Sequence, residues 1–310
     1  MASQPGLGWV SRFEHGGRED RVSTRGGGAV KPALGKVAYI NCEPVYYGIE
    51  QGAIPAECRI VEGTPAELNG MLRAGDLDLS VISAIEYACH SDRYLILPDL
   101  AIGSDGPTES VLLLSRVKPC DLDGKPVRLS RDSLTSVFLV KLLLAKAFGV
   151  RPRFLPAGAE TTDSLSEDVA GVLMIGDPAL RARGQLPFTL DLGQGWKELT
   201  GLPFVFAVWA VRRDFYRDHR DETHRLHRAL LCSKRYSLAR LDEICEAVCQ
   251  RVRLNRDACA TYLKERLSFD LTPRHLEGLR LFFTLLEAEG ELKSIPPLEF
   301  IDAVQDNAPG

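Results

Sequence analysis

The amino-acid sequence predicts an α/β fold of two lobes. Segments with strand-like patterns alternate along the chain with segments of helical periodicity, which is typical of sheets covered by helices. Two strand-like runs, residues 110–115 and 200–209, are apolar almost throughout, as strands buried on both faces are. A chain of 310 residues is long enough for about two domains. We therefore expect an α/β architecture with mainly parallel strands.

The first part of the chain contains a helix with clear start and stop signals. Thr64 precedes Pro65, and Glu67 stands where it can close a capping box with the threonine. The helix should end at Gly75. Around it we expect strands at residues 36–41, 59–62, 77–83 and 110–115, and a short helix at 84–90.

The second part continues the alternation. We expect strands at residues 127–130, 171–175 and 200–209, with an apolar helix over 134–148. Residues 213–266 are charged with helical periodicity, and a last amphipathic helix is expected at 273–289.

The two apolar runs divide the predicted lobes. The run 110–115 is expected to cross into a second lobe, and the run 200–209 to cross back. The predicted division is a leader at 1–31, one lobe formed by 32–113 plus 207–310, and a second lobe at 114–206. Ligands favour clefts between such lobes.

Composition excludes several classes of function. Residues 1–31 are polar and glycine-rich without an apolar core, which predicts a disordered leader and neither a signal peptide nor a membrane anchor. No later run approaches the roughly 18 apolar residues of a membrane span. The net charge of −4 favours neither nucleic acid nor an anionic membrane as a partner. We expect a cytoplasmic protein that acts on a small molecule.

The cysteines, histidines and glycines of the chain do not have the spacing that a metal site or a nucleotide site needs. The eight cysteines are scattered, and Cys245 and Cys249, four apart on a predicted helix, are more typical of buried thiols than of a metal site. Of the six histidines only His90 falls in the core segment. The one glycine run, at 26–28, has no strand before it. We expect no metal and no cofactor.

Small polar residues stand at the ends of several predicted strands, where α/β sheets bind ligands. Ser133, Thr135 and Ser136 lead directly into a helix, and N–H groups at a helix start suit a carboxylate or phosphate. Each candidate also has a structural interpretation: Ser133 as an N-cap, and Asp177 as a cap, which we favour over catalysis. The other candidates are Asn41 as a turn residue, Ser110 bonded to backbone, and Glu86 exposed or in a structural hydrogen bond.

Short motifs in a fixed order resemble a known family. The first is Tyr39-Ile40-Asn41-Cys42-Glu43-Pro44-Val45-Tyr46, and the others lie at residues 75–78, 97–102, 106–111, 133–136, 175–180 and 196–209. Together they resemble the chorismate dehydratases of the futalosine route to menaquinone. The resemblance extends from residue 36 to about residue 301.

The resemblance implies a two-lobed fold similar to type II periplasmic binding proteins, with the ligand between lobes joined by two crossing strands. It implies loss of water from chorismate to give 3-(1-carboxyvinyloxy)benzoate. Within the family pattern the catalytic positions fall on Asn41 and Ser110. The positions expected to bind substrate are Ser83, Thr135, Ser136, Gly176 and Asp177.

Two questions stay open. The proton acceptor is either a carboxylate of the substrate or, less favoured, Glu86 or Asp177. The rival functions are a non-catalytic solute-binding or sensor protein of the same fold, and a related lyase of the same route that uses a histidine, for which this core segment offers no counterpart.

Overall fold

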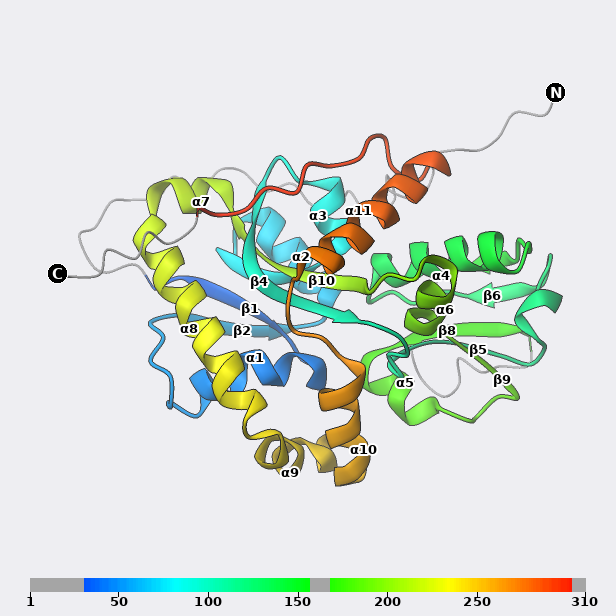
Figure 1. Ribbon diagram of the computed structural model, residues 1–310, viewed down its shortest axis with the longest axis horizontal. Helices are drawn as coiled ribbons and strands as arrows, with labels where there is room; N and C mark the ends of the chain where they lie inside the picture. The colour runs from blue at the N-terminus through cyan, green and yellow to red at the C-terminus, as the bar shows by residue number, and fades with distance from the viewer. Residues whose placement is uncertain (1–30, 157–167, 303–310) are drawn as a thin grey trace.

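The computed structural model describes residues 31–156 and 168–302, which form two lobes, each built on a five-stranded sheet (Figure 1). The predicted leader lies outside the described residues, except for Lys31. The first sheet has the order β2-β1-β3-β10-β4 and the second β7-β6-β8-β5-β9. The strands of the first sheet are β1 (Ala33–Val37), β2 (Arg59–Gly63), β3 (Leu79–Ser83), β4 (Tyr94–Ser104) and β10 (Phe204–Arg212). Those of the second are β5 (Val111–Ser115), β6 (Pro126–Arg128), β7 (Arg153–Leu155), β8 (Gly171–Ile175) and β9 (Phe188–Asp191).

Helices cover both sheets. The first lobe carries α1 (Glu43–Glu50), α2 (Pro65–Ala74), α3 (Ala84–Cys89), α7 (Arg213–Asp218), α8 (Arg220–Leu238), α9 (Leu241–Val252), α10 (Arg256–Thr261) and α11 (Pro273–Ala288), with the 3₁₀ turn η2 (Ile40–Cys42) and the π-helical turn η5 (Tyr262–Arg266). The second lobe carries α4 (Leu134–Ala147), α5 (Gly176–Ala182), α6 (Leu192–Thr200) and the 3₁₀ turn η3 (Pro119–Asp121). The predicted α/β class is confirmed. None of the helices in the described part of the chain is long and apolar enough to cross a bilayer.

The expectation of mainly parallel strands is confirmed, with one exception in each sheet. Strands β1, β2, β3 and β4 run in one direction, as do β6, β7, β8 and β9, but β10 is antiparallel to both its neighbours and so is β5. The reason is topological. Each of these two strands enters its sheet from the other lobe, without the helical crossover that would make it parallel to its neighbours.

The two connections between the lobes lie side by side. The chain leaves the first sheet at the end of β4 and returns at the start of β10, where Phe204 pairs with Ser104. The apolar runs named from the sequence overlap the strands that follow each connection: β5 begins at Val111, and β10 begins only at Phe204 because Thr200 still ends α6. We propose that the lobes divide here, close to the boundaries predicted at 113/114 and 206/207.

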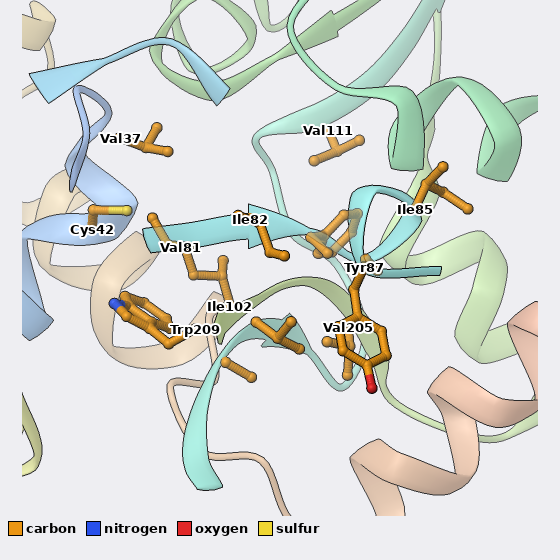
Figure 2. Close-up of a cluster of buried hydrophobic side chains, with 14 of the residues drawn as sticks. Val37, Cys42, Val81, Ile82, Ile85, Tyr87, Ile102, Val111, Val205 and Trp209 are labelled. Carbon is orange, nitrogen blue, oxygen red and sulfur yellow. The ribbon is translucent and has the colours of Figure 1, made fainter. Parts of the chain in front are cut away.

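One apolar core extends through both lobes. Figure 2 shows part of it, where Val81 and Ile82 of β3 lie near Val205 and Trp209 of β10. Trp196 of α6 extends the core across the lobes: its ring centroid lies 5.2 Å from that of Phe204 and 5.9 Å from that of Phe282. Edge-to-face packing of this kind adds to the stabilisation from burial.

The structure confirms the best-marked helix and corrects the first strand. Helix α2 has the predicted capping box between Thr64 and Glu67 and ends at Gly75 in a left-handed conformation. The strand expected at 36–41 instead occupies Ala33–Val37, because the chain then turns into η2. That turn sets Asn41 just beyond the carboxyl end of β1.

Candidate functional site

A cavity lies between the lobes, at the carboxyl ends of β1, β3 and β8. Counted together with open solvent at its mouth, the space between its walls is about 630 Å³. Its walls are mostly apolar and include Val37, Ile102 and Phe206. Five residues expected from the sequence to act on a ligand line it together: Asn41, Ser83, Ser110, Ser136 and Gly176.

Asn41 lines this space and carries an unsatisfied acceptor. Its Oδ1 is buried, and no hydrogen-bond partner is present for it among the described residues. A buried amide oxygen without a partner is costly unless a ligand or water satisfies it. The turn η2, which carries Asn41, is held from the second lobe, because the Ile40 N–H donates to Asp177 Oδ1 at 3.2 Å.

Ser110 precedes β5 and is 3% exposed. Its hydroxyl oxygen accepts a hydrogen bond from the Tyr262 hydroxyl at 2.9 Å. Its backbone is fixed at both ends: its N–H donates to Thr108 Oγ1 at 3.3 Å, and its carbonyl accepts from the Gly176 N–H at 2.8 Å. The expected bond from its own hydroxyl to backbone is not the one observed; a tyrosine takes that place.

A half-buried carboxylate supports the loop before Ser110. Asp191 accepts hydrogen bonds from the N–H groups of Thr108 and Glu109, and from Gly193 and Gln194 at the start of α6. Burial nevertheless raises the pKa of the Asp191 carboxyl. This arrangement joins residues 108–110 to the second lobe.

The start of α4 provides hydroxyl groups to the cavity wall. Ser133 is the N-cap, as the structural interpretation predicted, and its Oγ accepts from the Ser136 N–H at 3.2 Å and from the Ser136 hydroxyl at 3.1 Å. Both serines line the cavity. The positive end of a helix of this length favours an anionic group nearby.

Thr135 points elsewhere. It is fully buried, and its Oγ1 accepts from the Ile85 N–H at 3.0 Å, at the start of α3 in the first lobe. It is absent from the cavity lining. In this arrangement Thr135 connects the lobes, while Ser136 and Ser133 face the ligand space.

Gly176 and Asp177 begin the first turn of α5, at the end of β8, and this turn meets the first lobe. Asp177 is not the expected N-cap: Ile175 holds that position, and the Asp177 carboxylate reaches across to Ile40. Burial raises the pKa of Asp177. Gly176 has φ +62°, and a Cβ there would lie 2.7 Å from Cδ2 and Cε2 of Tyr39.

Ser83 and Glu86 both lie at α3 and differ in role. Ser83 lines the cavity while its Oγ accepts from the Glu86 N–H at 3.1 Å. Glu86 is buried, with an ion pair to Arg73 and a hydrogen bond from Tyr94. Its carboxylate is thus used in structure, one of the two outcomes expected from the sequence.

Sequence reasoning missed three residues of the site. Tyr39 lines the cavity and donates through its hydroxyl to Asp132 Oδ2 of the second lobe at 2.8 Å. Thr108 lines it beside Ser110, and Tyr262 supports Ser110 from outside. The first two stood in motifs already singled out, whereas Tyr262 lies in a charged helical segment without any distinguishing pattern.

The fold and the cavity define a two-lobed α/β protein with a ligand cleft between its lobes. Solved structures share this fold. A protein of Archaeoglobus fulgidus matches with a TM-score of 0.70 at 22% identity, over 84% of this chain and 98% of that one. The periplasmic aliphatic sulphonate binding protein of Escherichia coli matches with a TM-score of 0.62 at 13% identity, over 89% and 94%. The expected periplasmic-binding-protein fold is confirmed.

Sequence comparison gives the family. A family model described as menaquinone biosynthesis matches residues 32–288. The chorismate dehydratase of Thermus thermophilus is 34% identical over 71% of this chain and 82% of its own length. The 1,4-dihydroxy-6-naphtoate synthase of the same organism is 28% identical over 55% and 62%. The chain belongs to this menaquinone biosynthesis family.

Proposed function

We propose that this protein is a chorismate dehydratase, which removes water from chorismate to give 3-(1-carboxyvinyloxy)benzoate in menaquinone biosynthesis. The relationship to the Thermus thermophilus dehydratase carries the proposal, since the match covers most of both chains. The cavity agrees with it: a small space with hydroxyl, amide and helix-terminus groups suits a compact dicarboxylate.

The reaction needs a polar, dry site more than a strong acid or base. A hydrogen leaves the carbon that carries the enolpyruvyl ether, and the hydroxyl leaves the neighbouring carbon, so the ring becomes aromatic. The carbon that loses this hydrogen is connected to the ring carboxylate through a ring double bond. The carboxylate therefore takes up negative charge as the proton is removed. Donors already aimed at that carboxylate stabilise the charge without reorganising. We assign this role to the Ser133 hydroxyl and the N-terminus of α4, while Ser136, whose N–H and hydroxyl both donate to Ser133 Oγ, holds that hydroxyl in place.

Asn41 and Ser110 serve the departing hydroxyl. The Ser110 hydroxyl donates to the leaving oxygen, and the unpartnered Asn41 oxygen accepts from the hydroxyl proton of the substrate, which fixes its orientation. Ser83 and the Gly176 backbone complete the contact surface. Asp177 accepts a hydrogen bond from η2, and Thr135 accepts one from α3. Each bond holds the two lobes together.

A carboxylate of the substrate is the favoured proton acceptor. Among the described residues that line the cavity none carries a carboxylate, an imidazole or an amine. Glu86 and Asp177, the protein alternatives, are held by partners outside the lining. The proton taken from carbon and the hydroxide that leaves together make the water released, so no external acid or base is consumed.

The test is to incubate the purified protein with chorismate, without added cofactor, and to follow the product by chromatography and mass spectrometry. We expect Ser110→Ala and Asn41→Ala each to lower turnover at least 100-fold. Ser115→Ala is the matched control, because that serine is equally buried at the other end of β5 and donates to the Val117 carbonyl. Wild-type turnover by both variants would refute the assignment. Tight chorismate binding without product would favour a non-catalytic binding protein.

A further inference from the structure

Tyr262 is a wholly buried tyrosine whose hydroxyl reaches the proposed catalytic serine. It is 1% exposed, begins η5, and lies 2.9 Å from Ser110 Oγ through its hydroxyl oxygen. We propose that Tyr262 is a positioning residue that keeps the Ser110 oxygen occupied as an acceptor, so that the Ser110 proton is directed into the cavity toward the departing hydroxyl. This inference rests on the proposed function, since it refines the role of Ser110 in that reaction.

The hydrogen bonds around Ser110 determine where its proton goes. A tyrosine hydroxyl has one proton, and that of Tyr262 is donated to Ser110 Oγ. The backbone groups of Ser110 are already bonded to Thr108 and Gly176. Among the described residues Ser110 Oγ is hydrogen-bonded only to Tyr262, and Ser110 lines the cavity. Its proton is therefore left for an acceptor in the cavity.

The direction of this hydrogen bond follows from the chemistry of the two groups. A phenol is a stronger donor than an alkyl hydroxyl, so the tyrosine donates and the serine accepts. Burial raises the pKa of Tyr262, which keeps the phenol protonated at working pH. When the Ser110 hydroxyl donates its proton in a hydrogen bond to the leaving oxygen, negative charge grows on Ser110 Oγ. The hydrogen bond donated by Tyr262 stabilises that charge.

The local backbone keeps Tyr262 in register with Ser110. The segment η5 is π-helical, a rare form that is frequent at functional sites. At its other end the Arg266 guanidinium donates through Nε to Glu109 Oε1 at 2.8 Å. Two consecutive residues of the loop, Glu109 and Ser110, are thus bound by the two ends of one π-helical turn. Such double attachment suits a group that must be placed accurately.

The test is Tyr262→Phe, which removes only the hydroxyl. We expect kcat for chorismate to fall about tenfold with KM changed less than twofold, because the substrate is still bound while the proton donor is misdirected. Tyr87→Phe is the control. Tyr87, labelled in Figure 2, is also wholly buried; its hydroxyl donates to the Pro297 carbonyl at 2.8 Å and accepts from the Glu299 N–H at 2.9 Å. The Tyr87→Phe variant should lose at least as much thermal stability and keep its turnover.

A double-mutant cycle separates positioning from general structural damage. In a Ser110→Ala background, measured at high enzyme concentration, Tyr262→Phe should change the residual rate less than twofold. A further tenfold loss there, or wild-type kcat in Tyr262→Phe alone, would overturn the inference. Full turnover by Ser110→Ala would instead refute the proposed function of Ser110, so the two failures are distinguishable.

Discussion

Gly176→Ala tests whether the contact between the lobes at Tyr39 controls ligand binding. Alanine at this position meets two obstacles. The φ of +62° costs an L-residue about 1 kcal/mol, whether the lobes are open or closed. In addition the new Cβ would lie 2.7 Å from the Tyr39 ring, well inside ordinary contact distance. The ring must therefore retreat by roughly 0.7 Å before it is in normal van der Waals contact.

Moving the Tyr39 ring also disturbs the hydrogen bond that its hydroxyl makes between the lobes. The Tyr39 hydroxyl donates to Asp132 Oδ2 at 2.8 Å, and a shift of this size is enough to break it. A hydrogen bond to a charged group contributes about 1.5 kcal/mol at the lower end of its range, which fits the half-buried Asp132. Because the contact exists only when the lobes are together, its loss should weaken chorismate binding about tenfold.

The matched control is Gly184→Ala. Gly184 has φ +74°, and a Cβ there would meet nothing within 4 Å, so the control has the backbone strain without the clash. Both variants should lower the melting temperature by about 2 °C, since a 1 kcal/mol loss has that effect in a chain of this size. Only Gly176→Ala should raise the Kd for chorismate, measured by calorimetry. Equal affinity in the two variants would refute the reasoning.

Two other carboxylates give predictions of their own. Asp191→Ala leaves four N–H groups without their acceptor and should reduce the free energy of unfolding by about 3 kcal/mol in urea, with a loss of kcat because residues 108–110 are released; an unchanged urea midpoint would contradict this. In Asp177→Asn an oxygen acceptor for Ile40 is kept, while the ionisation is removed. Burial raises the pKa of Asp177, so folding favours the protonated acid, and wild-type stability is lost as pH rises through that pKa. The melting temperature of Asp177→Asn relative to wild type should therefore increase between about pH 4 and pH 7, and a difference independent of pH would argue against it.

Local signals explain what could be predicted from the sequence. The helix α2 was found because its capping box and its terminal glycine lie within a dozen residues. The site candidates Asn41, Ser83 and Ser110 could be chosen because strand ends in such a fold meet at one edge. The long strand β4 could not be predicted because Pro98 interrupts its strand pattern. The chain accommodates the proline with Asp99 at φ +61° and a shift in the pairing with β10.

Long-range contacts explain what could not be predicted. Asp177 has the sequence context of a cap, yet its partner is Ile40, 137 residues earlier in the chain. The Tyr262 hydroxyl meets Ser110 across 152 residues. Thr135 and Ser136 are adjacent in sequence and equally buried, but only their positions on α4 decide which faces the ligand and which faces α3. Spacing along the chain contains none of this information.

The turn at the end of β8 connects these observations. Its Gly176 N–H holds the Ser110 carbonyl, its Asp177 carboxylate holds the turn that carries Asn41, and its Gly176 backbone packs against Tyr39. The two proposed catalytic residues lie on separate segments and are supported by one turn of the second lobe. Their relative position is consequently fixed only while the lobes are together. Catalysis and closure should therefore be lost together when this turn is displaced, whereas a change at Tyr262 should alter the chemistry and leave closure intact.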